Sequence, residues 1–546
     1  MNSCEPQDIA IKSFFLGPQA ENADWLREKW IEILDNWIRW RRSIFPHDGN
    51  SISEADRNTP AFLEALRRLE TEFRYVLKVL EDETPKFTPR YLGHMVSEVS
   101  LPAILGHVCA LLHNPNNTSR EVSRVTSRLE EEAIADLAEM LGFDPKQACG
   151  HFTSGGTIAN FEALWRAIVR MDRSFEEKLH LSPLKLGPWV FAREYKNQTG
   201  HQFEGPVVLV PNNKHFSWEK AVSLMGLGEE ALWPVALDRT GRLSTDDLRA
   251  KLELAAERRR QVMLVVSVAG TTEMGEVDPI TEVQDILDLG RERGLDIWHH
   301  VDAAYGGYYT AMLDGDEVES KLNARVGRDL RAIRRVDSVT LDPHKLGYVP
   351  YACGAFIARD HEHYRVREFQ ATYLMRENNS RWVTTLEGSR SGAGVTATWL
   401  ANRALGLNAA GYGRLLAKGI EARDSVLHEL QSRAPEFLVV DPVDLNVLCF
   451  CFAPWGMKVS EINNRTEDIF RYFESSPCFS VSKTVLHAQA YGALLERLAS
   501  ERQLQMDQDH WFMLRLVLMN PFVTSKESKT AFVEEFVIEL LNFSRK

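Results

Sequence analysis

The sequence lacks any hydrophobic run long enough to cross a membrane, since no uninterrupted apolar stretch approaches the ~20 residues that this requires. Residues 1–6 also lack the basic start and apolar core of a secretory signal. Cysteine is scarce, with 7 residues in 546, and no two of them form a C-x-x-C pair. This scarcity argues against a disulfide framework and a metal site of the zinc type. We therefore expect a soluble, cytoplasmic protein with no membrane partner and no metal.

Basic residues are in deficit, because 64 Lys and Arg face 77 Asp and Glu and the net charge is −13 at pH 7. Nucleic acid is not expected as a partner, since phosphate contacts need a basic face. The chain has no low-complexity tract, and 44% of its residues are hydrophobic. Length and composition predict a large globular protein of two or three domains.

Hydrophobic patterns divide the chain into three parts. Residues 22–43 and 60–82 have the spacing of amphipathic helices, the first with a stripe of tryptophans. From about 130 to 360, apolar strands alternate with amphipathic helices, which is typical of a mostly parallel sheet covered by helices. Past residue 430, short strands interleave with helices and predict a smaller α+β domain.

Two residues suggest a specific chemistry. The stretch Asp342-Pro-His-Lys345 places a lysine amine beside a histidine, and a lysine in such an apolar segment can hold an aldehyde. Upstream, Ile297-Trp-His-His-Val-Asp302 has the pattern of a buried strand that ends in a carboxylate, which can bind a protonated pyridine nitrogen. Alone, the lysine is more often a solvated charge and the aspartate a turn or cap residue. Together they are the minimal apparatus of pyridoxal 5'-phosphate (PLP) chemistry.

Three further features fall in the chain order that such a site needs. The glycine-rich turn His151-Phe-Thr-Ser-Gly-Gly-Thr157 opens a helix, where free backbone N–H groups and the helix dipole can hold a phosphate. His215 lies at a strand-to-helix junction, where its imidazole could stack on a flat ring. Thr272 follows the predicted strand Val262-Met-Leu-Val-Val-Ser-Val268 and supplies a hydroxyl at that strand's end.

These motifs resemble those of the group II PLP-dependent amino-acid decarboxylases, and among them most closely the bacterial tyrosine decarboxylases. The likeness runs from about residue 85 to Met519-Asn-Pro521. The motifs that carry it are Tyr91-Leu-Gly-His-Met95, Asn114-Pro-Asn-Asn117, His151-Phe-Thr-Ser-Gly-Gly-Thr-Ile-Ala-Asn160, Lys214-His-Phe-Ser-Trp218, His300-Val-Asp-Ala-Ala-Tyr-Gly-Gly307, Asp342-Pro-His-Lys345, Ala371-Thr-Tyr373 and Leu386-Glu-Gly-Ser389. The chain is shorter than the tyrosine decarboxylases of lactic acid bacteria and its C-terminal third matches less obviously, which leaves the identity of the substrate open.

The resemblance implies an α/β protein with the PLP-dependent transferase type I fold, in which helices flank a mostly parallel seven-stranded sheet. Residues 1–125 would form an N-terminal helical dimerisation segment, with which the protein clasps a second copy in a homodimer. Residues 126–425 would form the large PLP-binding domain, and residues 426–546 the small C-terminal α+β domain.

The resemblance also implies roles for the cofactor site. Lys345 would bond to the aldehyde of PLP, and a desolvated lysine is a suitable nucleophile. Asp302 would pair with the pyridine nitrogen, Ala304 would pack below the ring, and His215 would stack on its other face. The other implied cofactor contacts are Gly156, Thr157, Thr272 and His344, with Gly388 and Ser389 reaching the phosphate from the neighbouring subunit.

Further residues are implied for substrate and protons. Arg515 aligns with an arginine that holds the α-carboxylate in glutamate decarboxylases, and a guanidinium fork suits a carboxylate; the alternative is a structural ion pair. Tyr373 matches a loop tyrosine proposed to protonate the α carbon after decarboxylation, and Tyr351 would support that proton path. Without the motif around it, Tyr373 would be taken for a packing aromatic.

The implied function is decarboxylation of an L-amino acid, with tyrosine or another aromatic amino acid as the leading substrate. Glutamate or aspartate is the alternative, with His94 and Ser97 as candidate donors to the side-chain carboxylate; Glu98 would disfavour such a substrate if it faced the pocket. An aromatic aldehyde synthase is a different reaction class, and Tyr373 argues against it. A carbon–carbon lyase such as sphingosine-phosphate lyase shares the fold, but those proteins usually carry a membrane anchor that we do not find in this sequence. A non-catalytic scaffold with a relic site is the least expected, because Lys345, Asp302 and His215 are all present.

Overall fold

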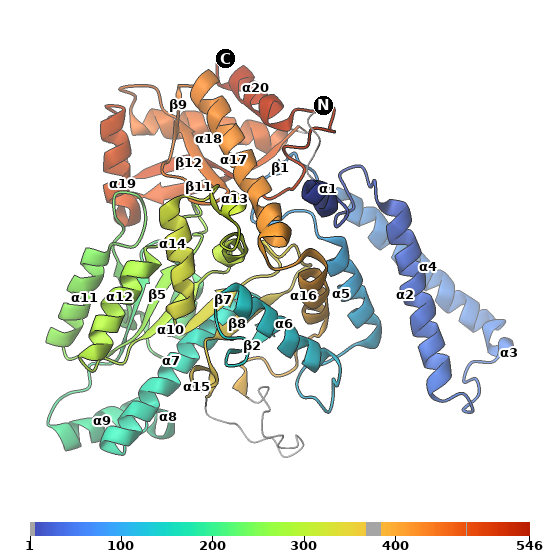
Figure 1. Cartoon of the computed structure of the whole chain (residues 1–546), viewed down its shortest axis with the longest axis horizontal. Helices are drawn as coiled ribbons and strands as arrows, with labels where there is room; N and C mark the ends of the chain where they lie inside the picture. The colour runs from blue at the N-terminus through green and yellow to red at the C-terminus, as the bar shows by residue number, and fades with distance from the viewer. Residues whose placement is uncertain (1–5, 367–383, 477, 546) are drawn as a thin grey trace.

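The computed structural model of the chain describes residues 6–366, 384–476 and 478–545. Two β-sheets lie one above the other in Figure 1, each accompanied by helices, and two long helices extend from the side of the molecule. In the described parts of the chain, no helix is both long and apolar enough to span a lipid bilayer.

The larger sheet has seven strands and is mostly parallel, as predicted, in the order β2-β8-β7-β6-β5-β3-β4. Strand β8 is antiparallel to both of its neighbours, whereas β7, β6, β5, β3 and β4 run parallel to one another. Every residue of β5 is buried, as expected for a parallel strand covered on both faces. The strands are β2 (Cys149–Thr153), β3 (Val207–Pro211), β4 (Leu232–Val235), β5 (Val262–Val268), β6 (Trp298–Asp302), β7 (Ser338–Leu341) and β8 (Gly354–Ala358).

Helices cover both faces of this sheet. On one face, Leu164 of α7 and Trp218 of α10 pack with Val266. On the other face, Val283 of α12 packs with Val265. Val265 is the neighbour of Val266 in β5, and successive side chains of a strand point to opposite faces. The helices between residues 101 and 405 are α5 (Leu101–His113), α6 (Thr126–Met140), α7 (Gly156–Leu179), α8 (Pro183–Leu186), α9 (Pro188–Thr199), α10 (Ser217–Leu224), α11 (Thr245–Glu257), α12 (Ile280–Glu292), α13 (Asp316–Glu319), α14 (Ala324–Ala332), α15 (His361–Tyr364) and α16 (Ala393–Leu405).

The smaller sheet has five strands in the order β1-β11-β12-β10-β9. Its first strand comes from the N-terminal part of the chain, where Tyr91 lies opposite Ser480 in a parallel pair. The sequence did not predict this strand, because two residues carry no periodicity. The elements around this sheet are β1 (Tyr91–Leu92), α17 (Arg414–Arg433), β9 (Phe437–Val439), β10 (Val447–Phe452), α18 (Val459–Ser475), β11 (Ser480–His487), α19 (Ala488–Glu501), β12 (His510–Val517) and α20 (Phe532–Ser544).

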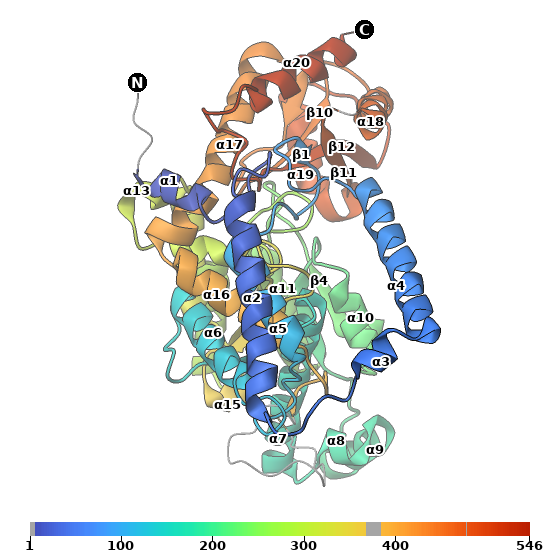
Figure 2. The ribbon, with the colours of Figure 1, turned by 90° about the vertical axis from the view of Figure 1, so that its right-hand side faces the viewer.

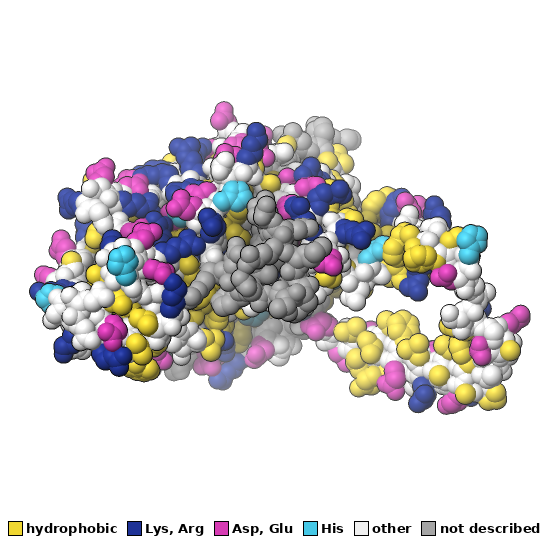
Figure 3. Space-filling view, turned by 90° about the horizontal axis from the view of Figure 1, so that it is seen from below, with side chains coloured by type: hydrophobic (Ala, Val, Ile, Leu, Met, Phe, Trp, Pro, Cys, Tyr) yellow, Lys and Arg dark blue, Asp and Glu magenta, His cyan; other side chains and the backbone are white. Residues whose placement is uncertain are grey.

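The N-terminal helices are α1 (Pro6–Lys12), α2 (Ala23–Ile44), α3 (Glu54–Arg57) and α4 (Pro60–Val79). Helix α1 packs on the body of the molecule, where Ile11 is buried in the core and Asp8 pairs with Arg414 of α17, whereas α2, α3 and α4 project from it. Helices α2 and α4 confirm the helices predicted at 22–43 and 60–82, and within these two described helices no residue is buried. Both extend away from the sheets in Figures 1 and 2, and hydrophobic side chains gather on them in Figure 3.

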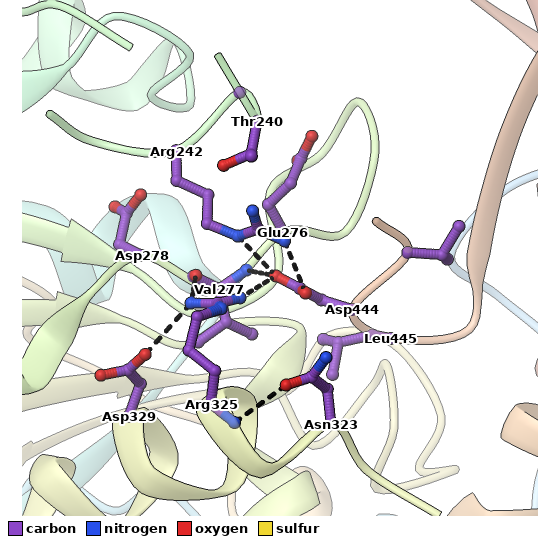
Figure 4. Close-up of polar contacts among 12 residues, drawn as sticks. Thr240, Arg242, Glu276, Val277, Asp278, Asn323, Arg325, Asp329, Asp444 and Leu445 are labelled. Atoms are coloured by element: carbon purple, nitrogen blue, oxygen red, sulfur yellow. Dashed lines mark hydrogen bonds and ion pairs between the residues drawn. The ribbon is translucent and has the colours of Figure 1, made fainter. Parts of the chain in front are cut away.

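A buried ionic network joins the two sheets (Figure 4). Asp444, in the loop between β9 and β10, accepts two hydrogen bonds from Arg242, at 2.9 and 2.6 Å, and one from Arg325 at 2.6 Å. The backbone N–H of Val277 donates to the same carboxylate at 2.9 Å. A buried charge is tolerated when it is paired in this way, and the pairing fixes the end of the loop 270–277 that follows β5.

Candidate active site

A cavity of about 340 Å³ opens beside the carboxyl ends of the parallel strands β3, β5, β6 and β7 and the N-terminus of α7. This is the edge at which open α/β sheets bind their ligands. Eight of the predicted site residues line it: Gly156, Thr157, His215, Thr272, Asp302, Ala304, His344 and Lys345. The other lining residues are Met95, Ser154, Gly155, Ile158, Asn160, Asn213, Phe216, Val268, Gly270, Tyr305 and Asp342.

Lys345 lies in the turn that follows β7. Its Nζ is 3.2 Å from Oδ2 of Asp342, and Nε2 of His344 is 3.4 Å from the same oxygen. The backbone N–H of Cys353 donates to Nδ1 of His344 at 3.2 Å, which orients the imidazole toward Asp342. The site therefore pairs the predicted lysine with a carboxylate to which the sequence analysis gave no role.

Asp302 ends β6 and is held by groups behind the cavity. The Asn160 side-chain amide donates to its Oδ2 at 2.8 Å, and the backbone N–H of Ala304 lies 3.3 Å from its Oδ1. Asn160 in turn accepts a hydrogen bond from the Thr340 hydroxyl at 2.8 Å. The adjacent His300 is buried, which lowers its pKa to about 3 and keeps it neutral. Asp302 is thus a carboxylate whose orientation is fixed by hydrogen bonds, and the side chains around it, such as Asn160 and His300, are neutral.

The N-terminus of α7 forms the opposite wall. Gly156 is its first residue, and a Cβ at this position would lie 2.9 Å from Oδ2 of Asp342 and 3.2 Å from Cβ of Ala304. Glycine is therefore required at position 156, because any side chain would come too close to Asp342 and Ala304. The backbone N–H groups at the start of a helix are free to bind an anion, so the predicted phosphate cradle faces the same cavity as Lys345.

His215 lies just before α10, with its Nδ1 3.3 Å from the backbone N of Ser217. Burial lowers the pKa of His215, despite the opposing effect of the Asp302 charge. A neutral imidazole at this wall is suited to face a flat ring. Thr272 and Ala304 line the cavity from the loops after β5 and β6.

Six of the predicted site residues do not line the cavity, namely Tyr351, Gly388, Ser389, Arg515, His94 and Ser97, and Tyr373 lies outside the described residues. Tyr351 is exposed, and its ring stacks on His344 with centroids 4.1 Å apart. Ser389 accepts a hydrogen bond from the Asn116 side chain at 3.0 Å. His94 is exposed, and the charge of Arg515 acts on its imidazole.

Arg515 is buried on β12. Its Nε donates to the Glu273 carbonyl at 3.1 Å and its guanidinium donates to the Ser482 hydroxyl at 3.2 Å. Among the described residues it forms no salt bridge, so the structural ion pair considered from the sequence is not there. Partial desolvation of its imidazole, and then the charge of Arg515, lower the pKa of His94. A buried guanidinium without an anion is a candidate carboxylate receptor.

Glu98 does not face the cavity. Its Oε1 accepts the backbone N–H of Gly17 at 3.0 Å, and burial raises its pKa to about 7. The condition under which Glu98 would disfavour an acidic substrate is therefore not met, because its carboxyl group binds the N-terminal segment and does not line the cavity.

The cavity has the groups that PLP requires. Lys345 offers an amine for an aldehyde, Asp302 a carboxylate for a pyridine nitrogen, and the glycine turn a helix N-terminus for a phosphate. A carboxylate oxygen of Asp342 has no hydrogen-bond partner in the described parts of the chain. Together, the amine, the carboxylate and the helix N-terminus fit a charged, ring-shaped ligand. This combination is typical of the class of PLP-dependent enzymes.

Residues 76–453 match the pyridoxal-dependent decarboxylase conserved domain, and the chain belongs to this family. The protein is therefore a PLP-dependent amino-acid carboxy-lyase with PLP as its cofactor. The resemblance inferred from the motifs is confirmed.

Curated relatives agree with this assignment. An L-tyrosine decarboxylase of Enterococcus faecium is 27% identical over 95% of this chain and 96% of its own length. An L-tyrosine decarboxylase of Levilactobacillus brevis is 30% identical over 76% of this chain and 74% of its own length. An aspartate 1-decarboxylase of Aliivibrio fischeri is 27% identical over 82% of this chain and 79% of its own length.

A solved structure supports the fold. The structure of Oryza sativa TDC with PLP and tryptamine superposes with a TM-score of 0.68 at 16% identity, and covers 96% of this chain and 98% of that one. At this identity the likeness concerns the fold, which is the predicted type I α/β architecture.

Proposed function

We propose that the protein removes carbon dioxide from L-tyrosine or another aromatic L-amino acid and leaves the corresponding amine. The observation that carries this proposal is the similarity, over most of the chain, to proteins named L-tyrosine decarboxylase. The cavity wall supports it, because Met95, Phe216 and Tyr305 offer apolar and aromatic surface to a ring.

The alternative substrate is an acidic amino acid, aspartate or glutamate. The relative named aspartate 1-decarboxylase favours it, and Glu98, whose carboxyl points away from the cavity, does not oppose it. His94, on which the charge of Arg515 acts, is the candidate donor to a second carboxylate.

Substrate choice is tested with the PLP-loaded protein and a panel of tyrosine, tryptophan, phenylalanine, aspartate and glutamate at equal concentrations. Carbon dioxide and amine are measured for each. We expect the highest kcat/KM with tyrosine or another aromatic amino acid. A higher value with aspartate or glutamate would replace this proposal by the alternative, and aldehyde with hydrogen peroxide in place of amine would indicate an aldehyde synthase.

The residues around the cavity have distinct proposed roles. PLP, when bound, supplies an aldehyde that bonds to the substrate amine and a ring that draws electrons from the bond to the carboxyl group. Lys345 carries the aldehyde between turnovers, and Asp302, supported by Asn160, holds a proton on the ring nitrogen. His215 and Ala304, which both line the cavity, would hold the ring between them. Further contacts are proposed for Gly156, Thr157, Thr272 and His344.

Arg515 is proposed to bind the α-carboxylate of the substrate. Replacing it in Arg515→Lys removes the fork but keeps a positive charge, so kcat/KM should fall by roughly 10- to 150-fold, equivalent to about 1.5–3 kcal/mol for a lost charged hydrogen bond. Inhibition by the amine product, which has no carboxylate, should be unchanged. The matched control is Arg502→Lys, because Arg502 is another arginine of the small domain but donates to backbone carbonyls. Equal losses in both variants, or weaker amine binding in Arg515→Lys, would contradict this role.

The protein is also proposed to act in the cytoplasm as a homodimer. Residues 1–125 would be the dimerisation segment, 126–425 the PLP-binding domain and 426–546 the small domain. The apolar side chains exposed on α2 and α4 support a second copy as their partner. By family likeness, Gly388 and Ser389 would reach the phosphate in the other subunit.

Dimerisation is tested by sedimentation at the concentration of the activity assay. The unmodified protein should sediment as a dimer. Trp30→Glu or Leu66→Glu should shift it toward the monomer and lower activity, because each places a charge on an apolar face that the proposed dimer would bury. Trp189→Glu is the control, since Trp189 is 87% exposed but lies on α9. A fully active monomer would contradict the proposal.

A further inference from the structure

The cavity contains two buried carboxylates, and their partners differ. Asp302 accepts hydrogen bonds from a neutral amide and from the backbone, at 2.8 and 3.3 Å. Asp342 instead lies 3.2 Å from Nζ of Lys345 and 3.4 Å from Nε2 of His344. In the described parts of the chain, Asp342 is the carboxylate in an ion pair with Lys345. The two carboxylates are therefore placed for different tasks.

The backbone holds Asp342 and Lys345 together. The Asp342 N–H donates to the Ala304 carbonyl at 3.2 Å, and the Lys345 N–H donates to the Asp342 carbonyl at 2.9 Å, which closes a turn directly after β7. Asp342 is 3% exposed. A carboxylate buried this deeply needs a positive partner, and the turn places the Lys345 amine within reach of it.

Other titratable groups that face Asp342 do not replace Lys345 as its partner. Burial raises the pKa of Tyr308 well above its ordinary value and raises the pKa of Cys353 to about 12, so both are neutral near pH 7. Tyr351 is exposed, and a phenol is also neutral at this pH. Burial lowers the pKa of His215, which also faces Asp302 and Lys345. The remaining facing groups are Lys345 and His344, whose contacts with Asp342 are given above.

We propose that Asp342 is a positioning residue that holds Lys345 as an ammonium and takes up its proton when the amine reacts. The proposal rests on the role of Lys345 in the proposed function. It concerns the proton of the lysine, whereas Asp302 remains the partner of the ring nitrogen.

The proton count shows what this role involves. Lys345 can bond to an aldehyde carbon only as the neutral amine, so one proton must first leave Nζ, and Oδ2 of Asp342 lies 3.2 Å away to accept it. The two hydrogens left on the nitrogen would leave with the aldehyde oxygen as water. Once a substrate amine had taken the place of Lys345, Asp342 would return the proton to Nζ, and an ammonium there would not compete with the substrate for the aldehyde carbon.

Asp342→Asn tests the proposal, because it removes the charge and keeps the shape. The cofactor-free full-length protein is mixed with pyridoxal between pH 5.5 and 9, and the rate of visible absorbance gain is measured. Pyridoxal has no phosphate, so relief of repulsion between a phosphate and Asp342 does not contribute. Without the negative charge of Asp342, the ammonium form of Lys345 is less favoured relative to the reactive amine. In Asp342→Asn, the pH at which the rate is half-maximal should therefore fall by about 1–3 units. Below both midpoints, the variant should react about 10-fold faster or more.

Asp302→Asn is the matched control, because it removes the other buried carboxylate, and it should shift the midpoint less. Asp342→Ser is a second variant, for the case that the asparagine amide in Asp342→Asn disturbs folding. Thermal melting verifies that each variant is folded. Borohydride reduction and peptide mapping show whether Lys345 carries the label. An unchanged midpoint with the label on Lys345 would overturn the role of Asp342 and leave the proposed function intact. A label on another lysine would overturn the proposed role of Lys345 itself.

Discussion

Lys345→Ala is expected to abolish both turnover and the visible absorbance that PLP gains when bonded to a lysine amine. The reason is that Lys345 is the lysine lining the cavity of the described residues, opposite the helix N-terminus and Asp302. Without it the aldehyde has no amine to bond to between turnovers. Absorbance spectra and carbon dioxide release from tyrosine are the measurements.

Lys214→Ala is the matched control for this variant. Lys214 is close in sequence to the cavity residue His215, but its Nζ pairs with Glu219 at 2.8 Å. The control should keep the visible absorbance. If Lys345→Ala kept it too, or if Lys214→Ala lost it, the assignment of the reactive lysine would be wrong.

Tyr373→Phe is expected to slow amine formation by typically 10²–10⁴-fold, the usual effect of losing a positioned general acid. Tyr373 lies outside the described residues, and its role comes from the family motif. Binding of PLP and substrate should persist, because the lost hydroxyl serves to protonate the α carbon after carbon dioxide has left. An α carbon that waits for a proton can react with dioxygen, so products should shift from amine toward aldehyde, ammonia and hydrogen peroxide.

The measurement is the yield of amine and of peroxide per carbon dioxide, with an aromatic substrate. Tyr351→Phe is compared with it, since Tyr351 stacks on His344 at the edge of the site. An unchanged amine yield at an unchanged rate in Tyr373→Phe would show that the proton comes from another group, and a shift in Tyr351→Phe alone would assign it to Tyr351.

The parts of the fold that sequence could predict are those with a long, regular pattern. The strand β5, apolar except for Ser267, and the amphipathic helix α2 were predicted within a residue or two, because an apolar run and a helical stripe are each clear in the sequence. Strand β1 was missed, since its pairing with β11 joins Tyr91 to Ser480 across most of the chain. No local period records such a contact.

In the candidate site too, local motifs identified some residues, whereas the roles of others depend on contacts that are distant in sequence. Motifs placed Lys345 and Asp302, and the structure brings both to one cavity. Asn160 and Asp342 stood in the same motifs but received no role, because what each does depends on its partner: Asn160 reaches Asp302 from a helix 142 residues away in sequence. The orientation of Glu98 was also beyond the sequence, since it is set by the backbone of Gly17.

The most direct test of the central claim is the chemical identity of the residue that holds the cofactor. The PLP-loaded protein is reduced with borohydride, digested and mapped by mass spectrometry. Our account predicts the pyridoxyl group on the peptide that contains Lys345 and on no other. A pyridoxyl group on a different lysine would contradict it.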